Sequence, residues 1–157
     1  LSTLDLATGL RQAVPLAQAS EGAYAPENGV LFFTRLPKQG SSTKRYEGGW
    51  IQNLWRFAPG DAEATPIPTD FKGTRRNPMW WRGRLYFISD RDGIMNLWSC
   101  LPDGSDVRQL TRRRDFDIAS ASLRETVVVV TTSVLTVSAR RPRLADPITA
   151  VTWSPEP

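Results

Sequence analysis

The sequence of 157 residues contains no histidine and a single cysteine, Cys100. Without histidine, the chain alone cannot form a histidine-dependent catalytic triad, a histidine metal site or an imidazole proton shuttle. One cysteine excludes an internal disulfide and a cysteine-rich zinc site, and it agrees with a reducing compartment. The composition therefore excludes histidine-dependent catalysis and metal sites built from histidine or several cysteines, and we expect no metal ion and no cofactor in this stretch of chain.

Long hydrophobic runs are also missing. The longest apolar run, Val127–Val130, is far shorter than the ~20 residues that a bilayer-spanning helix needs, so no membrane contact is expected. The chain opens at Leu1 without an initiator methionine, a basic leader region or an apolar leader region, and no signal peptide is visible. We expect the sequence to be a fragment of a longer protein.

A repeat organises the chain. Asn53-Leu54-Trp55 recurs 43 residues later as Asn96-Leu97-Trp98. An apolar strand-like run precedes each copy (Gly29–Arg35 and Gly83–Ser89), and a turn with a short fourth run follows each. A period of about 40–45 residues with four short strands is typical of β-propeller blades. The sequence thus predicts an all-β fold: an incomplete β-propeller of antiparallel four-stranded blades, about three to four of them present.

The repeat also predicts the domain organisation. A partial β-propeller spans residues 1–123 and contains a blade end (1–19), two blades (20–70 and 71–114) and the start of another blade (115–123). The first whole blade carries an 11-residue insertion between Leu36 and Gly49. Residues 124–157 form an atypical tail.

Two Asp-Gly pairs predict tight hairpins. Asp92-Gly93 and Asp103-Gly104 each lie between strand-like runs, and Asp-Gly favours a type I′ turn, in which both central residues have positive φ. The first pair, with Asp90 nearby, lacks the residue order of a calcium loop. We therefore interpret this segment as a turn and not as a metal site.

The tryptophans are predicted mainly as core residues. Trp55 and Trp98 occupy matched positions in the repeat, and we expect both in the interblade core together with either Trp80 or Trp81. Trp50 stands at the end of the insertion, and the sequence does not decide between a core position and an exposed one.

Basic residues are concentrated late in the chain. Residues 108–143 hold 8 basic and 3 acidic side chains, whereas the whole chain has a net charge of +4. The run Arg112-Arg113-Arg114 suits either an anionic partner or a solvated loop between blades. No aromatic ribonucleoprotein signature accompanies it, so we favour the loop and predict no nucleic acid partner.

Several segments together resemble the amino-terminal propeller of tricorn-type proteases, a WD40-like six-bladed β-propeller. The segments are Phe33–Arg35, Lys44–Gly49, Asn53–Trp55, Pro78–Trp81 and Leu85–Gly93. The Ser-Asp-Arg-Asp-Gly turn alone also resembles the periplasmic Tol-system propeller. The insertion Lys44-Arg45-Tyr46-Glu47-Gly48-Gly49 favours the tricorn resemblance, which runs from residue 1 to about Leu123.

The resemblance implies a large, oligomeric, cytoplasmic serine peptidase as the parent protein, and a non-catalytic part of it as this chain. Family members carry their catalytic Ser, His, Ser and Glu in a carboxy-terminal core, to which nothing here corresponds, so whether the chain belongs to an enzyme depends on the parent. The propeller is then expected to serve substrate access and to contact short peptides and the remaining domains.

The same resemblance implies that basic residues of the propeller hold a peptide carboxylate, for which an arginine fork is well suited. Lys44, Arg45 and Tyr46 are the candidate loop, because the repeat does not require the insertion. A plain solvated loop held by Gly48-Gly49 is an equal alternative. The alternative function is a stand-alone scaffold propeller resembling the periplasmic Tol-system protein, which a signal peptide and an early stop in the gene would favour.

The repeat pattern ends near Leu123. Gly104 is the last glycine, and only Phe116 and Trp153 are aromatic after Trp98, although propeller hairpins depend on glycine for positive φ. The tail is either translated out of frame, or a diverged blade, or the start of a new one. We predict that residues from about Arg124 form no native blade, with a frame change as the cause.

An incomplete propeller ring is expected to associate with other molecules of the same chain. Closure takes ~4–8 blades, so an isolated chain exposes sheet faces and edges that a full ring buries. We therefore expect poor solubility or oligomers when the chain is produced alone.

Overall fold

A computed structural model describes residues 1–38, 47–124, 127–132 and 149–151. Within this part the chain has thirteen strands and no helix. The strands are β1 (Ser2–Leu4), β2 (Arg11–Ala13), β3 (Gly22–Ala25), β4 (Val30–Thr34), β5 (Leu54–Phe57), β6 (Thr65–Pro66), β7 (Arg75–Trp81), β8 (Arg84–Ser89), β9 (Asn96–Cys100), β10 (Arg108–Gln109), β11 (Ile118–Arg124), β12 (Val127–Thr132) and β13 (Thr149–Val151).

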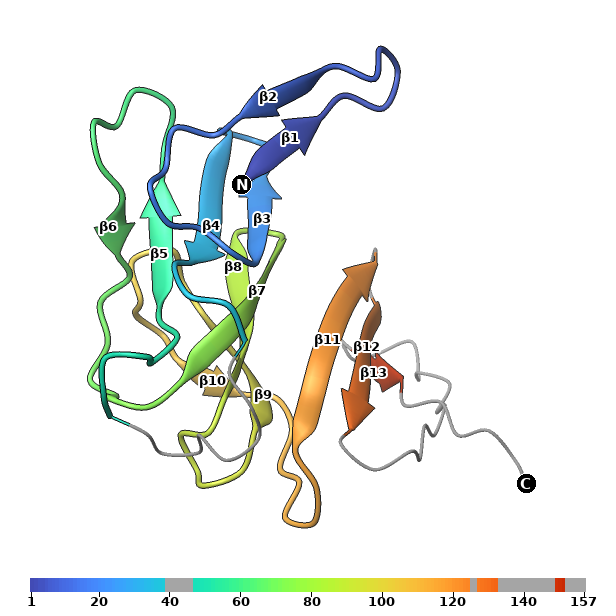
Figure 1. Cartoon of the computed structure of the whole chain (residues 1–157). Coiled ribbons are helices and arrows are strands. Elements are labelled where there is room, and N and C mark those ends of the chain that lie inside the picture. The colour runs from blue at the N-terminus through green and yellow to red at the C-terminus, as the bar shows by residue number, and fades with distance from the viewer. Residues whose placement is uncertain (39–46, 125–126, 133–148, 152–157) are drawn as a thin grey trace.

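Two complete four-stranded sheets form the centre of the fold (Figure 1). The first blade pairs its strands in the order β3-β4-β5-β6 and the second in the order β7-β8-β9-β10, antiparallel throughout. The hairpin β1-β2 precedes them, and a third sheet, β11-β12-β13, follows. The predicted all-β fold of antiparallel four-stranded blades is confirmed, and the sheets form an open arrangement.

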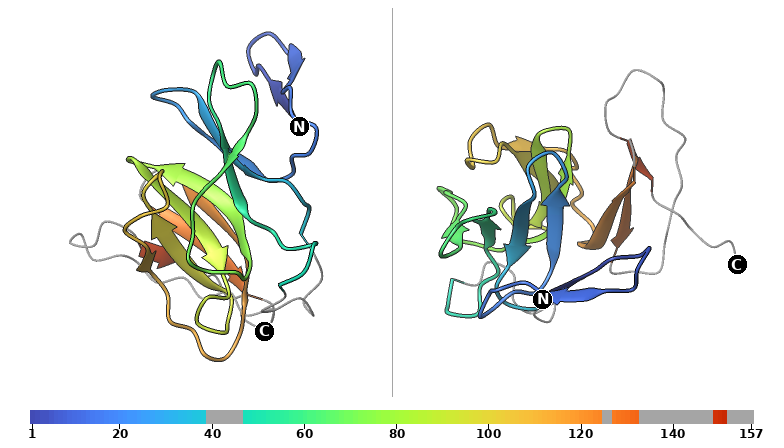
Figure 2. Two further views of the ribbon diagram at one scale, coloured as in Figure 1. Left: turned by 90° about the vertical axis from the view of Figure 1, so that its left-hand side faces the viewer. Right: turned by 90° about the horizontal axis from the view of Figure 1, so that it is seen from above.

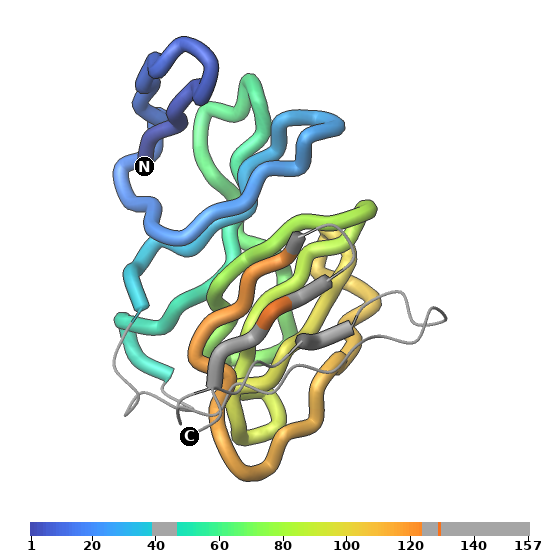
Figure 3. Tube along the Cα trace, turned by 90° about the vertical axis from the view of Figure 1, so that its right-hand side faces the viewer, coloured from blue at the N-terminus to red at the C-terminus, as the bar shows by residue number. Residues whose placement is uncertain are grey.

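The sheets stack face to face in chain order. Strands β3 and β4 pack on β7, and β11 packs on β7 and β8. The second blade therefore contacts the first blade on one side and the third sheet on the other. The left view of Figure 2 shows β11 behind the second blade, and Figure 3 shows it in front of the second blade from the opposite side. This stacking is the way in which a single blade buries its two apolar faces.

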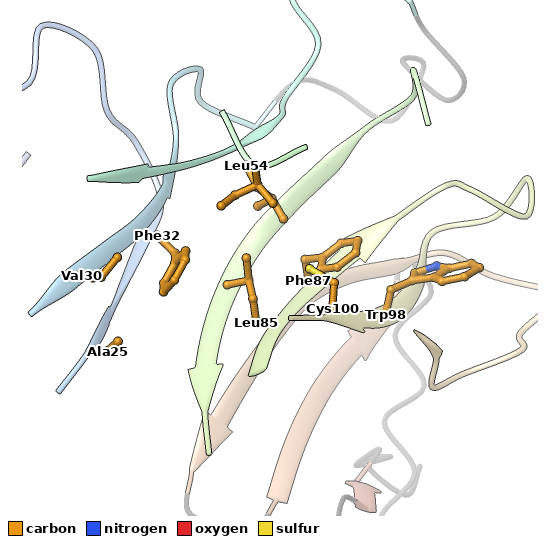
Figure 4. Packing of buried hydrophobic residues seen from close by; sticks show 9 residues of the cluster. Ala25, Val30, Phe32, Leu54, Leu85, Phe87, Trp98 and Cys100 are labelled. Atoms are coloured by element: carbon orange, nitrogen blue, oxygen red, sulfur yellow. The ribbon is translucent and has the colours of Figure 1, made fainter. Parts of the chain in front are cut away.

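Alternation along β8 supplies both interfaces of the second blade, because successive side chains of a strand point to opposite faces. Leu85 and Phe87 join the core cluster shared with the first blade, together with Phe32, Leu54, Trp98 and Cys100 (Figure 4). Tyr86 and Ile88 join the cluster shared with Ile118 of the third sheet. Burial raises the pKa of the Cys100 thiol to about 11, so this cysteine is a protonated core residue at neutral pH.

The tryptophans divide between core and partly buried positions. Trp98 is 8% exposed, as predicted. Trp80 and Trp81 are both partly buried and pack on opposite clusters; Trp80 stacks on Phe32 with ring centroids 4.9 Å apart. The prediction for Trp55 is wrong, since it is only half-buried. Trp98 packs toward the first blade, and Trp55 correspondingly faces away from the second blade. On that side only the two-stranded sheet β1-β2 precedes the first blade in the described residues.

Hairpin geometry also corrects the sequence-based prediction. Only the glycine of each Asp-Gly pair has positive φ, 99° at Gly93 and 86° at Gly104. Each glycine closes a four-residue turn: its N–H donates to the carbonyl oxygen of Asp90 (2.8 Å) or Leu101 (2.9 Å). The loops between β8 and β9 and between β9 and β10 contain more than two residues. Neither is therefore a two-residue type I′ turn, in which both central residues would have positive φ.

The two-residue type I′ loop occurs instead at Arg82-Gly83, with φ of 45° and 76°. This loop joins β7 to β8 directly after the Trp81–Arg84 pair. An arginine at the first position gave no sequence signal for this turn type, which usually favours Asn or Asp there.

The described part of the tail is extended. β12 pairs antiparallel with β11, and β13 adds to the other edge of β12 in parallel. This parallel addition departs from the antiparallel order of the two complete blades, in which each strand runs opposite to its neighbours. The frame-change explanation remains a prediction that only the coding DNA tests.

Candidate functional site

A hollow of about 430 Å³ opens at one end of the first blade, where β4 ends and β5 begins. We call it the Trp50 hollow. It is lined by Gln18, Arg35, Leu36, Gly49, Trp50, Ile51, Asn53 and Trp55. The predicted loop residues Lys44, Arg45 and Tyr46 lie outside the described residues. In the sequence, however, their segment connects Leu36 to Gly49, and both of these residues line the hollow.

Two tryptophans and one arginine give the hollow its character. The guanidinium carbon of Arg35 lies 3.5 Å from the ring centroid of Trp55, a cation–π arrangement that arginine favours over lysine. Trp50 is 59% exposed, which decides the question that the sequence left open. The hollow therefore presents an exposed cation beside two aromatic faces.

The rim of the hollow is fixed by side chains of the first blade. The carbonyl oxygen of Leu36 accepts hydrogen bonds from Gln52 Nε2 (3.0 Å) and from Thr34 Oγ1 (3.2 Å). Both donors are buried. The backbone that carries Arg35 and Leu36 thus leaves β4 along a defined path.

Asn53 contributes a polar atom without a partner. The repeat matches it to Asn96, which is fully buried and whose Oδ1 accepts from Thr111 Oγ1 (2.7 Å) and from the Arg113 N–H (2.9 Å). Asn53 Oδ1 is also buried but has no hydrogen-bond partner among the residues that the structure describes. A buried carbonyl oxygen without a donor is rare in proteins and calls for an explanation.

A proline explains the loss of one of the two donors. Pairing of the outer strands places Trp55 opposite Pro66 and Trp98 opposite Gln109, so Pro68 stands where the second blade has Thr111. Proline has neither a hydroxyl group nor a backbone N–H. The acceptor of Asn53, which lines the Trp50 hollow, thus has no donor in the part of the blade that the structure describes. Aligning the two blades by sequence could have revealed this substitution.

Comparison with known proteins places the chain in a family. The family model described as the tricorn protease N-terminal beta propeller domain matches residues 1–135. The chain belongs to this family. The match reaches twelve residues past Leu123, where the motif resemblance stops.

Two curated relatives agree with the family model. Tricorn protease homolog 1 of Streptomyces coelicolor is 32% identical over 108 residues, which cover 69% of this chain and 10% of that protein. The tricorn protease homolog of Saccharolobus solfataricus is 34% identical over 79 residues, which cover 50% of this chain and 7% of that protein. The tricorn-family propeller chain thus spans a tenth or less of the length of these relatives.

A solved structure of TolB from Agrobacterium tumefaciens shows the same fold. It has a TM-score of 0.52 and 14% sequence identity, and the match covers 69% of this chain and 35% of that one. At this identity the likeness concerns the propeller architecture alone.

A second hollow of the tricorn-family propeller, of about 550 Å³, lies on the second blade beside the basic run and is lined by Asp92, Ile94, Gln109 and Arg112–Arg114. Arg113 pairs with Asp115 (3.1 Å), and Gln109 donates to Asp92. The polar groups around Arg113 are thus engaged within the loop. This geometry agrees with our interpretation of the run as a solvated loop between blades.

Sequence reasoning missed a pair of buried arginines on β7. Arg75 Nη2 donates to the carbonyl oxygen of Ile67 in the first blade (2.8 Å), and Arg76 Nη1 donates to that of Ala119 in the third sheet (2.8 Å). Burial lowers the pKa of Arg75 to about 10, so it remains charged at neutral pH. Adjacent arginines in a strand gave no signal of burial, because arginine is usually exposed.

The part of the chain that the structure describes contains no group of three or more His, Cys, Asp or Glu side chains placed to hold a metal ion. It also contains no helix of the length and hydrophobicity needed to cross a membrane.

Proposed function

We propose that this chain is a non-catalytic propeller segment of a larger, cytosolic serine peptidase of the tricorn type. In that parent it serves substrate access, binds short peptides and contacts the other domains. Family membership supports the parent, and the Trp50 hollow supports peptide binding. The decisive observation is the combination of exposed Arg35, two aromatic faces and the unpartnered acceptor of Asn53 in one hollow.

Each group of the hollow suits one part of a short peptide. The Arg35 guanidinium can hold a carboxylate through two parallel charge-assisted hydrogen bonds. The faces of Trp50 and Trp55 offer apolar surface to a side chain. Asn53 Oδ1 can accept a peptide N–H, which would also satisfy a buried acceptor. A peptide with a free carboxylate and an apolar last residue therefore fits the hollow best.

Titration with the tripeptide Ala-Ala-Phe tests this proposal, with tryptophan fluorescence and calorimetry as readouts. We expect Arg35→Gln to weaken binding at least about tenfold, because a hydrogen bond to a charged group contributes ~1.5–3 kcal/mol. The same peptide with an amidated carboxyl end should bind the unchanged protein with a similar loss.

Arg82→Gln is the matched control, since Arg82 also lies over a tryptophan, 4.6 Å from the Trp81 ring, but outside the hollow. Its affinity for the peptide should equal that of the unchanged protein. Equal affinity for the acid and the amide, or no binding at all, would contradict a peptide site in the Trp50 hollow.

The parent is tested separately by the coding sequence around this stretch. A downstream PDZ-like segment followed by a catalytic serine in the same reading frame would support the peptidase. A signal peptide and a stop codon soon after the propeller would instead support a stand-alone scaffold. The two tests are independent: the peptide titration tests binding in the Trp50 hollow, and the coding sequence tests the parent protein.

A further inference from the structure

A third hollow, of about 340 Å³, lies on the first blade and adjoins the Trp50 hollow. We call it the Glu63 hollow. It is lined by Pro15–Gln18 from the linker between β2 and β3, by Phe33 and Arg35 at the end of β4, and by Ala62–Ala64 just before β6. Gln18 and Arg35 line both hollows. The two hollows therefore meet at these side chains.

The Glu63 hollow carries one charge of each sign. Arg35 and Glu63 are both exposed, and within the described ranges neither of them forms an ion pair. Arg35 lies over the Trp55 ring, and Glu63 accepts no hydrogen bond from any described residue. The hollow thus presents a cation and an anion that are separate from each other and open to a ligand.

Glu63 corresponds to Asp106 of the second blade. The strands β6 and β10 are matched by their pairing with the strands that carry the Asn-Leu-Trp motif, and each acid lies two positions before its strand. Asp106 binds two arginines, Arg84 and Arg108, each at 2.7 Å. In the second blade, the acid at this place is therefore paired within its own blade.

The first blade has no cation at either matching position. Val30 opens β4 as Arg84 opens β8. Thr65 opens β6 as Arg108 opens β10. Neither valine nor threonine carries a charge. The unpaired state of Glu63 therefore follows from two sequence differences within the first blade itself.

The arginine beside the matched tryptophan shows the same contrast. In the second blade, Arg91 lies 5.8 Å from the centroid of the Trp98 ring and pairs with Asp70 of the preceding linker at 2.8 Å. Asp70 is the fourth residue after β6, and the fourth residue after β2 is Ala17. Arg35 of the first blade therefore lacks the counter-ion that Arg91 has in the second.

We propose that the two adjoining hollows bind a short peptide whose amino and carboxyl ends are both free. This inference rests on the peptide binding proposed for the Trp50 hollow and adds recognition of the amino end. Arg35 holds the carboxylate, which takes the part that Asp70 plays for Arg91. Glu63 binds the α-ammonium group, which takes the part of the arginines that bind Asp106. The α-amino group has a pKa of ~8 and is mostly protonated at neutral pH, so both contacts are charge-assisted hydrogen bonds.

The size of the Glu63 hollow limits the length of the peptide. Arg35 and Glu63 line the same hollow of about 340 Å³, so the two ends of the ligand must lie close together. Three small residues, Ala17, Ala62 and Ala64, leave room for the peptide backbone between them. Each further residue adds ~3.3–3.6 Å of extended chain and carries the ammonium group past Glu63. The ligand class is therefore free peptides of two or three residues.

Calorimetric titration of the full chain with Ala-Ala-Phe and N-acetyl-Ala-Ala-Phe tests the amino-end contact. Acetylation removes the positive charge and should weaken binding about fivefold, near the upper limit for an exposed ion pair. Glu63→Gln should bind the free and the acetylated peptide equally, while amidation of the carboxyl end still weakens binding. Glu47→Gln is the matched control, because Glu47 is exposed and lines neither hollow. This variant should keep the fivefold preference for the free amine.

Reversal of the charge gives a second test. Glu63→Lys should prefer N-succinyl-Ala-Ala-Phe, which carries a carboxylate at its amino end, over the free tripeptide. A merely structural role of Glu63 would not produce this reversal.

The outcomes separate the amino-end contact from the carboxylate site. If the unchanged protein binds the free and the acetylated peptide equally but prefers the acid to the amide, the role of Glu63 is wrong and the carboxylate site at Arg35 stands. A preference for the free amine that persists in Glu63→Gln would also overturn the role of Glu63. If none of these peptides binds, both the amino-end contact and the peptide site are wrong.

Discussion

Replacing Asn96 by alanine should lower the free energy of unfolding by about 3 kcal/mol, since each buried group left without its hydrogen bond costs ~1–3 kcal/mol. Asn96 is fully buried and connects β9 to the segment after β10. Its Oδ1 accepts from Thr111 and from the Arg113 N–H, and its Nδ2 donates to Asp92 (3.0 Å) and to the Arg113 carbonyl oxygen (3.1 Å). Removal of the amide leaves four polar groups, on Asp92, Thr111 and Arg113, without this hydrogen-bond partner.

Asn53→Ala is the matched control, because Asn53 holds the same place in the first blade but its Oδ1 accepts no hydrogen bond from any residue in the described ranges. Its substitution should cost less than about 1 kcal/mol, since it removes a buried unsatisfied acceptor along with any remaining contacts. Urea unfolding of both variants at one fixed protein concentration measures the difference. Equal losses for the two variants would show that Asn96 is not a hydrogen-bonding centre of the second blade.

Phe87→Ala should lower the free energy of unfolding by about 4 kcal/mol, within the range for deletion of a buried phenylalanine. Phe87 is 1% exposed and belongs to the core cluster between the two complete blades. Figure 4 shows its ring beside Leu85, Trp98 and Cys100. The blades would be held less tightly, because truncation leaves a cavity in the contact that joins them.

Leu6→Ala provides the control for Phe87, as Leu6 is 92% exposed in the turn between β1 and β2. Its loss should change the midpoint of urea unfolding very little. If the midpoint of urea unfolding of Phe87→Ala equals that of the unchanged protein, the prediction is wrong and the two blades do not unfold as one unit.

Most of the β-propeller framework could be predicted from the repeat. The spacing of Asn53-Leu54-Trp55 and Asn96-Leu97-Trp98 placed β5 and β9, and the glycine-led apolar runs placed β4 and β8. These positions are local: a strand needs only alternating side chains and a turn at each end. The candidate site was harder to predict. The predicted residues Lys44–Tyr46 lie outside the described residues, and the Trp50 hollow combines residues from three separate segments.

The sequence by itself determined that this chain is all-β, that it contains two whole blades, and that it has no histidine chemistry. Only the tertiary structure decided that Trp55 is half-buried while its match Trp98 is buried, and that Arg75 and Arg76 are buried between sheets. The physical reason is that burial of a propeller residue depends on the neighbouring blade. Strand patterns describe one blade, whereas the neighbour that covers its face comes from another part of the chain.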